Sequence, residues 1–99
     1  MLVLQYTFTR PNTSVNFYSA SEDASVVSAI IAAQDNGDIL SFDDSISSDS
    51  LVMTRIVNVP SEDALARLNA TAVLATNKQA RTAYNNSNGI TESVTQGTA

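Results

Sequence analysis

The sequence predicts an α+β fold in one small domain, in which two extended segments each lead into a helix. The tetrapeptide Ser-Glu-Asp-Ala occurs at residues 21–24 and again at 61–64, each time between an apolar extended stretch and a stretch with helical spacing. Serine accepts hydrogen bonds from the free N–H groups of a first helical turn, and carboxylates are favoured at the positive end of the helix dipole. The repeat therefore marks two strand-to-helix junctions.

The chain begins with a segment that has the pattern of a half-buried strand. Residues 2–9 place leucine and aromatic side chains on one parity and smaller or polar ones on the other. This period of two predicts a strand with one buried face. Pro11 lacks a backbone donor and indicates a turn. A short extended segment, residues 15–18, follows, and we expect Phe17 or Tyr18 to pack beneath the coming helix.

The first helix is expected over about residues 22–34, with Ser19 or Ser21 as its capping residue. Gly37 is suited to the left-handed backbone conformation that commonly follows a helix end, so it marks the end of this helix. The side chains expected to form the buried stripe share helical spacing. They are Ala24, Val27, Ile30, Ile31 and Gln34.

Two strands, a second helix and a last extended segment follow. Residues 39–46 predict a strand that either lies at a sheet edge or contains a bulge, because acidic side chains interrupt the apolar pattern. Residues 51–59 are apolar on both parities, which indicates a central strand or one whose second face meets a partner. A long helix is expected over about 62–84, and residues 90–95 have the composition of a short fourth strand. Residues 96–99 predict a flexible tail.

The resulting order is β-α-β-β-α, with a last β left open. It is the order of the ferredoxin-like split β-α-β arrangement, in which two helices cover one face of an antiparallel sheet. Short connections and right-handed crossovers leave few competing topologies. We therefore expect a single α+β domain over residues 1–95, followed by the tail.

Composition narrows the range of functions. Ten acidic residues stand against five basic ones, and histidine and cysteine are absent. Nucleic acids and anionic membranes bind clustered cations, whereas these are scattered, so neither partner is expected. The commonest general base, thiol nucleophile and transition-metal ligands are missing. We therefore expect a protein that is not an enzyme, with no catalytic residue, metal or cofactor. No apolar run has the length of a membrane span, and a signal peptide is not expected.

Acidic side chains gather in the expected turns and helix starts. The two Ser-Glu-Asp-Ala copies are interpreted as helix caps rather than as a metal site, because hard cations need about six or more converging oxygens. Residues 35–38 match only part of a calcium-loop pattern and predict a solvated turn. One alternative is a regulator whose acidic strip imitates nucleic acid. That strip would consist of Asp35, Asp38, Asp43, Asp44 and Asp49.

The sheet face that the helices leave uncovered is a candidate interface. Its side chains are neither charged nor fully apolar, and we expect a second copy of the chain to cover its β-branched members. The candidate interface residues are Val3, Gln5, Thr7, Val52, Thr54 and Ile56.

A ligand pocket between the sheet and the helices is the second candidate. The residues expected to line it are Arg10, Arg55, Arg81 and Tyr84. Polar strand residues would help to orient the ligand. They are Gln5, Thr7, Thr54 and Asn58. A closed cavity of several hundred Å³ with converging polar groups would favour this alternative, and a solid core in that place would rule it out.

Several stretches resemble small uncharacterised proteins encoded by tailed phages of marine bacteria and cyanobacteria. They are residues 6–13, Phe17-Tyr18, residues 83–85 and residues 88–91. The resemblance spans most of the chain and carries no catalytic residue with it. It implies a minor virion component, or a protein acting in the cytoplasm of the infected bacterial host. Its partner would be itself, as a dimer or higher oligomer, or another phage structural protein.

The expected topology also resembles dimeric ferredoxin-like families, including the antibiotic-biosynthesis monooxygenase group. Our first interpretation is a non-enzymatic protein-interaction or assembly protein. The alternative is a small-ligand-binding or cofactor-free monooxygenase-like protein. Because a fold does not determine function, this second resemblance leaves both open.

Overall fold

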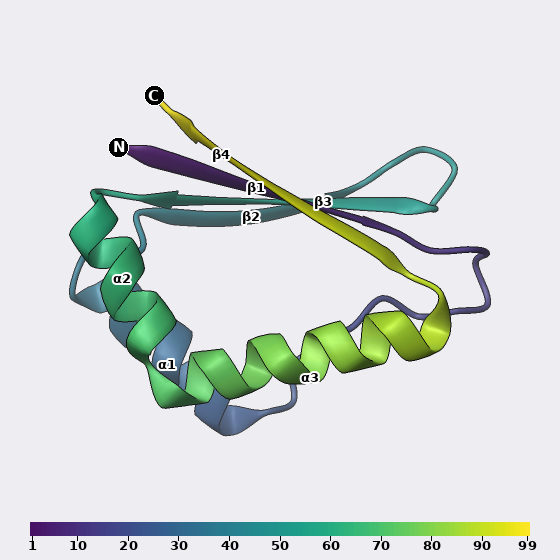
Figure 1. Cartoon of the computed structure of the whole chain (residues 1–99), viewed down its shortest axis with the longest axis horizontal. Coiled ribbons are helices and arrows are strands. Elements are labelled where there is room, and N and C mark those ends of the chain that lie inside the picture. The colour runs from purple at the N-terminus through teal and green to yellow at the C-terminus, as the bar shows by residue number, and fades with distance from the viewer.

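A computed structural model describes residues 1–99 and shows a four-stranded antiparallel sheet with three helices on one face (Figure 1). The elements are β1 (Leu2–Thr9), α1 (Ala24–Asp35), β2 (Ser41–Ile46), β3 (Val52–Val59), α2 (Glu62–Ala70), α3 (Ala72–Asn88) and β4 (Thr91–Thr98). The strands lie in the order β2-β3-β1-β4. This split arrangement confirms the predicted ferredoxin-like α+β fold.

The two central strands, β1 and β3, hold the sheet together. β1 is antiparallel to both β3 and β4, so that Leu4 stands opposite Val57 on one side and Gln96 on the other. β2 pairs with β3 at the far edge. β3 is therefore central and β2 is an edge strand, as their patterns predicted. Because side chains alternate along each strand, even-numbered residues of β1 face the helices.

The core lies between the sheet and the helices in two parts. The larger part consists of Leu2, Leu4, Ala33, Ile39, Val57 and Val59. Phe8, Met53 and Ile90 form the smaller part. Ile30 and Leu68 pack against the larger part from α1 and α2. The aliphatic stripes of both helical units therefore share one interior, which accounts for the fold.

The start of α1 differs from the sequence-based expectation. Asp23 is the N-cap instead of Ser19 or Ser21, and its carboxylate accepts hydrogen bonds from the backbone N–H groups of Ser25 (3.1 Å) and Val26 (3.4 Å). An aspartate is as good a cap as a serine and also carries the charge that the helix dipole favours. The helix therefore starts two residues later than the predicted 22.

The buried stripe of α1 is shifted as a consequence. Val26 and Ala33 are buried, Ile30 is half-buried, and Ile31 and Gln34 are exposed. The prediction that Ala24, Ile31 and Gln34 lie on the inner face was wrong, because all three are exposed. Ile31 is 50% exposed, which makes it a useful control position for core substitutions.

The long helix predicted over 62–84 is two helices. Thr71 separates α2 from α3 with φ −70° and ψ 115°, an extended conformation, and its hydroxyl donates to the carbonyl of Arg67 (2.9 Å). A β-branched residue with its own local hydrogen bond tolerates such a break. Figure 1 shows the chain changing direction between α2 and α3, so each helix packs on a different part of the sheet.

The C-terminal part is more ordered than the sequence indicated. α3 continues to Asn88, and Gly89 caps it in the left-handed conformation with φ 70°, donating its N–H to the carbonyl of Asn85. β4 confirms the fourth strand that residues 90–95 suggested. It extends through Thr98, which pairs with Leu2. Residues 96–98 therefore lie in the sheet and not in the expected flexible tail.

An ion pair fastens the loop between α1 and β2 to α2. The Asp38 carboxylate accepts hydrogen bonds from Arg67 Nη2 (2.7 Å) and Nε (3.1 Å). This hydrogen-bonded guanidinium lowers the pKa of Asp38 below its ordinary value of 3.8, and Asp38 in turn raises the pKa of Arg67. The carboxylate form of Asp38 is thereby favoured in the folded state.

Asp38→Asn is expected to lower the urea midpoint of unfolding at neutral pH but not in strong acid. The folded pKa of Asp38 lies below the unfolded one. The stabilisation is therefore fully present above the unfolded value of about 4 and disappears as pH falls through the folded value. Unfolding followed by circular dichroism at both pH values checks this. A difference between variant and natural chain that is the same at both values would contradict it.

No helix has both the length and the apolar character that crossing a lipid bilayer requires.

Candidate functional site

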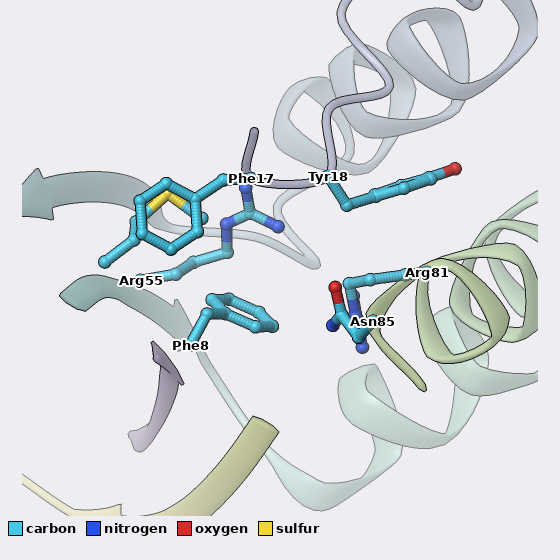
Figure 2. Close-up of a pocket in the computed structure, with 7 residues that line it drawn as sticks. Phe8, Phe17, Tyr18, Arg55, Arg81 and Asn85 are labelled. Carbon is cyan, nitrogen blue, oxygen red and sulfur yellow. The ribbon is translucent and has the colours of Figure 1, made fainter. Parts of the chain in front are cut away.

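Aromatic and cationic side chains gather between β1, β3 and α3 (Figure 2). The residues that line this place are Phe8, Phe17, Tyr18, Met53, Arg55, Arg81 and Asn85. We call it the inner site. Its side chains lie so close together that no room remains for a water molecule. The closed cavity of several hundred Å³ is therefore absent, and the cavity criterion for a ligand pocket is not met in this conformation.

Arg81 is the most buried cation of the inner site. Its side chain is 11% exposed, and its Nε donates to the Glu92 carboxylate (2.7 Å). The guanidinium carbon lies 5.4 Å from the ring centre of Tyr6 and 5.7 Å from that of Phe8. Nη1 and Nη2 make no hydrogen bond within the chain, and neither is completely buried. Two N–H-bearing nitrogens therefore stay free for an acceptor from outside.

Asn85 and Glu92 orient Arg81. Asn85 lies one helical turn after Arg81 on α3, is 2% exposed, and brings its amide nitrogen to 3.5 Å from the same Glu92 oxygen. A guanidinium with so little contact with water needs a paired carboxylate, and Glu92 on β4 supplies it. The guanidinium is thus held in one orientation against the ring faces of β1.

Arg55 is the second cation of the inner site, and its charge is already paired. On β3 it donates from Nε and Nη2 to the two carboxylate oxygens of Asp44, at 2.8 and 3.1 Å. Its guanidinium carbon lies 4.8 Å from the ring centre of Phe42 and 5.7 Å from that of Phe8. A bidentate, stacked arginine of this kind is rigid. Arg55 therefore forms a fixed positive wall.

Arg10 and Tyr84 hold a chain segment over the inner site rather than lining it. The guanidinium carbon of Arg10 lies 4.4 Å from the ring centre of Phe17, and its Nη1 donates to the carbonyl of Val15 (3.0 Å). The Tyr84 hydroxyl donates to the carbonyl of Asn16 (2.7 Å). Both therefore fasten residues 15–18, which we call the strap.

The structure brings the four predicted pocket residues together in two roles. Arg55 and Arg81 line the inner site, and Arg10 and Tyr84 fasten the strap above it. The lining residues that sequence reasoning assigned to the core, or did not single out, are Phe8, Phe17, Tyr18, Met53 and Asn85. Asn85 carried one usable signal, because it follows Arg81 by four positions and so shares its helix face.

The strand residues expected to orient a ligand lie on the opposite face of the sheet. Gln5 pairs with Ile56, and Thr7 with Thr54. Their odd parity in β1 points them away from the helices, so the prediction that Gln5, Thr7, Thr54 and Asn58 help to form the pocket was wrong. The six candidate interface residues share this uncovered face. They are Val3, Gln5, Thr7, Val52, Thr54 and Ile56.

The acidic residues do not form a free strip. Asp38 is paired with Arg67, and Asp44 with Arg55. Asp49 accepts hydrogen bonds from its own turn, which lower its pKa. No three acidic side chains gather where they could hold a metal ion. These contacts weaken the alternative of a nucleic-acid mimic, since its charges are largely used within the fold.

A second hollow lies beside the inner site, between α1 and α3. This outer groove is open to solvent and has a volume of about 280 Å³. Its lining residues are Tyr18, Asp23, Ser25, Val26, Ala72, Val73, Thr76, Asn77 and Ala80. Tyr18 is the one residue that lines both the outer groove and the inner site.

Known proteins match this chain in structure and not in sequence. A scan against models of protein families finds no match, and a search of curated proteins finds none. Solved structures with the same architecture include SnoaB, a cofactor-independent oxygenase from Streptomyces nogalater, with a TM-score of 0.64 and 17% identity over 99% of this chain and 91% of its own. The chain therefore shares its ferredoxin-like fold with an oxygenase.

Two further structures agree. A proposed antibiotic biosynthesis monooxygenase from Deinococcus radiodurans has a TM-score of 0.62 and 14% identity over 100% of this chain and 92% of its own. Rv0793 from Mycobacterium tuberculosis has a TM-score of 0.55 and 13% identity over 100% of this chain and 97% of its own. Identities this low show a common fold and nothing finer.

The prediction that the chain is not an enzyme is contradicted by this comparison. It was based on the missing histidine and cysteine, whereas SnoaB shows that this fold carries an oxygenase that needs no cofactor. The fold neighbours favour the oxygenase-like alternative over the assembly interpretation. None of them bears on a phage origin, a virion role or a partner protein, and these stay predictions.

Proposed function

We propose that the chain binds a flat, weakly acidic aromatic molecule in the inner site and oxidises it with dioxygen without a cofactor. The observation that carries the proposal is Arg81, an oriented and mostly buried guanidinium with two free nitrogens beside aromatic rings. The oxygenase activity of SnoaB, which has the same fold, supports the reaction class. Aromatic faces bind flat aromatic substrates, and a guanidinium binds their anions.

The chemistry of such a reaction matches the groups present. Without a cofactor, the electrons that reduce dioxygen come from the substrate. An activated methylene loses a proton to water before the site closes around the substrate, and the resulting carbanion transfers electrons to dioxygen. Both C–H bonds break, one oxygen atom becomes a carbonyl, and the other leaves as water. Arg81, with Arg55 as a second positive wall, would stabilise the carbanion most strongly in a site closed to water.

Anthrone tests this proposal, because its methylene lies between two aromatic rings and its oxidation yields anthraquinone and water. We expect the protein to raise the rates of oxygen uptake and anthraquinone formation at least about tenfold over the protein-free solution. Lys78→Leu is the matched control, since Lys78 is an exposed cation of α3 outside the inner site. A natural chain that leaves the protein-free rate unchanged would contradict the proposal for this substrate.

We also propose that a second copy of the chain covers the uncovered sheet face. Two observations support it. Val52, at one end of β3, and Ile56, near its middle, are partly exposed apolar side chains on this face, and the Asn58 side-chain oxygen is buried without a hydrogen-bond partner. An open face with these side chains gains from being covered.

Ile56→Asp is expected to convert a dimer to a monomer, because it would place a charge in the covered area. Light scattering at high micromolar concentration checks this by molar mass. Lys78→Asp, which also adds an acid but lies on α3, should keep the dimer. A natural chain with the mass of a monomer would contradict self-association through this face.

A further inference from the structure

We propose that Tyr18 is the gate between the outer groove and the inner site, and that the strap must open there for a ligand to enter. This inference extends the proposed function, and its prediction about ligand binding rests on that function. It starts from a mismatch. The inner site has the groups to bind a ligand but no room for a water molecule, whereas the adjoining groove has about 280 Å³ and none of the arginines. Tyr18 alone lines both.

The strap has weak attachments. None of residues 15–18 makes a backbone-to-backbone hydrogen bond, and the strap belongs to no helix or strand. Side-chain bonds hold it instead. They run from Arg10 to the carbonyl of Val15 (3.0 Å), from Tyr84 to the carbonyl of Asn16 (2.7 Å) and from the Tyr18 hydroxyl to Asn77 Oδ1 (2.9 Å). A segment held in this way opens at lower cost than a strand of the sheet.

The contacts of the Tyr18 side chain would allow its ring to turn. Figure 2 shows its ring pointing away from Arg55, with the hydroxyl at the far end. The ring packs at a tilt of 58° on Tyr84, with the ring centres 5.6 Å apart. Breaking the one hydrogen bond from the Tyr18 hydroxyl to Asn77 would free the ring to turn. The inner site would then join the outer groove.

The gate and the inner site share one helix. Asn77, Arg81 and Asn85 follow one another at intervals of four on α3, so they lie along one face of it. A ligand that reaches Arg81 therefore passes the partner of the Tyr18 hydroxyl. Closure behind it would exclude water from the charged groups, as loop closure does in many enzymes.

A thiol-labelling experiment tests the gate without any ligand. The chain contains no cysteine, so Met53→Cys puts a single thiol on the floor of the inner site, and Ala33→Cys puts one in the larger core part as a control. Each is combined with Tyr18→Phe, which removes only the hydroxyl, and with Tyr18→Ala. The rate of reaction with a small aromatic disulfide is measured under native conditions.

The gate predicts that Tyr18→Phe raises the labelling rate at position 53 at least about threefold and Tyr18→Ala at least about tenfold, with position 33 unchanged within about twofold. If Tyr18→Ala does not fold, Tyr18→Phe alone decides. Rates at position 53 that do not respond, or that rise in parallel with position 33, would overturn the gate, because labelling would then follow global unfolding.

A second experiment distinguishes a failure of the gate from a failure of the proposed function. Stopped-flow binding of 2-naphthoate, a flat aromatic carboxylate, should show association and dissociation both accelerated by Tyr18→Phe, with a smaller change in Kd. An altered dissociation rate with an unchanged association rate would make Tyr18 an ordinary wall residue and would overturn the gate. If 2-naphthoate does not bind while the labelling rates respond as expected, the gate stands and the proposed ligand class is wrong.

Discussion

Arg81→Leu is expected to lower kcat/KM for anthrone oxidation about 100-fold, equivalent to about 2.7 kcal/mol of transition-state stabilisation. The reason is the placement of this guanidinium. Glu92 holds its Nε, two rings flank it, and its remaining nitrogens are free to meet a developing anion. Oxygen uptake and anthraquinone formation, measured against substrate concentration, give kcat and KM separately.

Controls separate this effect from lost stability. Arg81→Leu leaves the Glu92 carboxylate, 24% exposed, without its cationic partner, and this destabilises the fold. Replacing both residues by leucine should recover stability but not activity. Arg81→Lys should retain part of the activity, because an ammonium keeps the charge without the planar fork. Equal activity in Arg81→Leu and Lys78→Leu would show that Arg81 does not take part in the reaction.

Leu4→Ala is expected to lower the free energy of unfolding by about 3 kcal/mol, because it removes a buried side chain and leaves a cavity. Leu4 is 6% exposed, lies on the central strand and belongs to the larger core part. Urea unfolding followed by circular dichroism measures the change. Because small domains have margins of only about 5–15 kcal/mol, the loss is a large fraction of the total.

Ile31→Ala is the matched control for this substitution. It removes similar apolar atoms from a position that is 50% exposed, and alanine favours the helix, so we expect a change within about 0.5 kcal/mol. Equal losses at Leu4 and Ile31 would contradict the placement of the core between the sheet and the helices.

The strands were predictable because their chemistry is local. The first strand was predicted from a period of two, and the alternation of Leu4, Tyr6 and Phe8 assigned the inner face of β1 correctly. Two-sided apolar character indicated that residues 51–59 form a central strand or one whose second face meets a partner, and β3 is central. A strand with a buried face has little freedom to shift its register, since a slip of one residue would expose its whole apolar set.

The helix boundaries could not be predicted from the sequence, because several residues compete to cap a helix and tertiary packing can break one. Three side chains near the start of α1 can cap a helix, and Asp23 prevailed over Ser19 and Ser21. The break at Thr71 has no proline or glycine to signal it. It arises because α2 and α3 pack on different parts of a sheet, which is a tertiary constraint.

The sequence predicted only some of the residues that line the inner site. Arg55 and Arg81 were among the predicted pocket residues, whereas Tyr18 was assigned to the core and Asn85 to the end of a helix. Their roles follow from contacts between segments far apart in the chain, such as the bond from Tyr18 to Asn77. The absence of histidine and cysteine was given too much weight, because an arginine beside aromatic rings can stabilise an anion without either.

Amide-resolved NMR titration of the isotope-labelled chain with 2-naphthoate shows directly whether a flat aromatic anion binds at the inner site. We expect the largest shifts at Phe8, Arg81 and Asn85, together with the side-chain Nε–H of Arg81. Saturable shifts confined to the uncovered sheet face or to the outer groove, or no shift at any residue, would contradict this expectation.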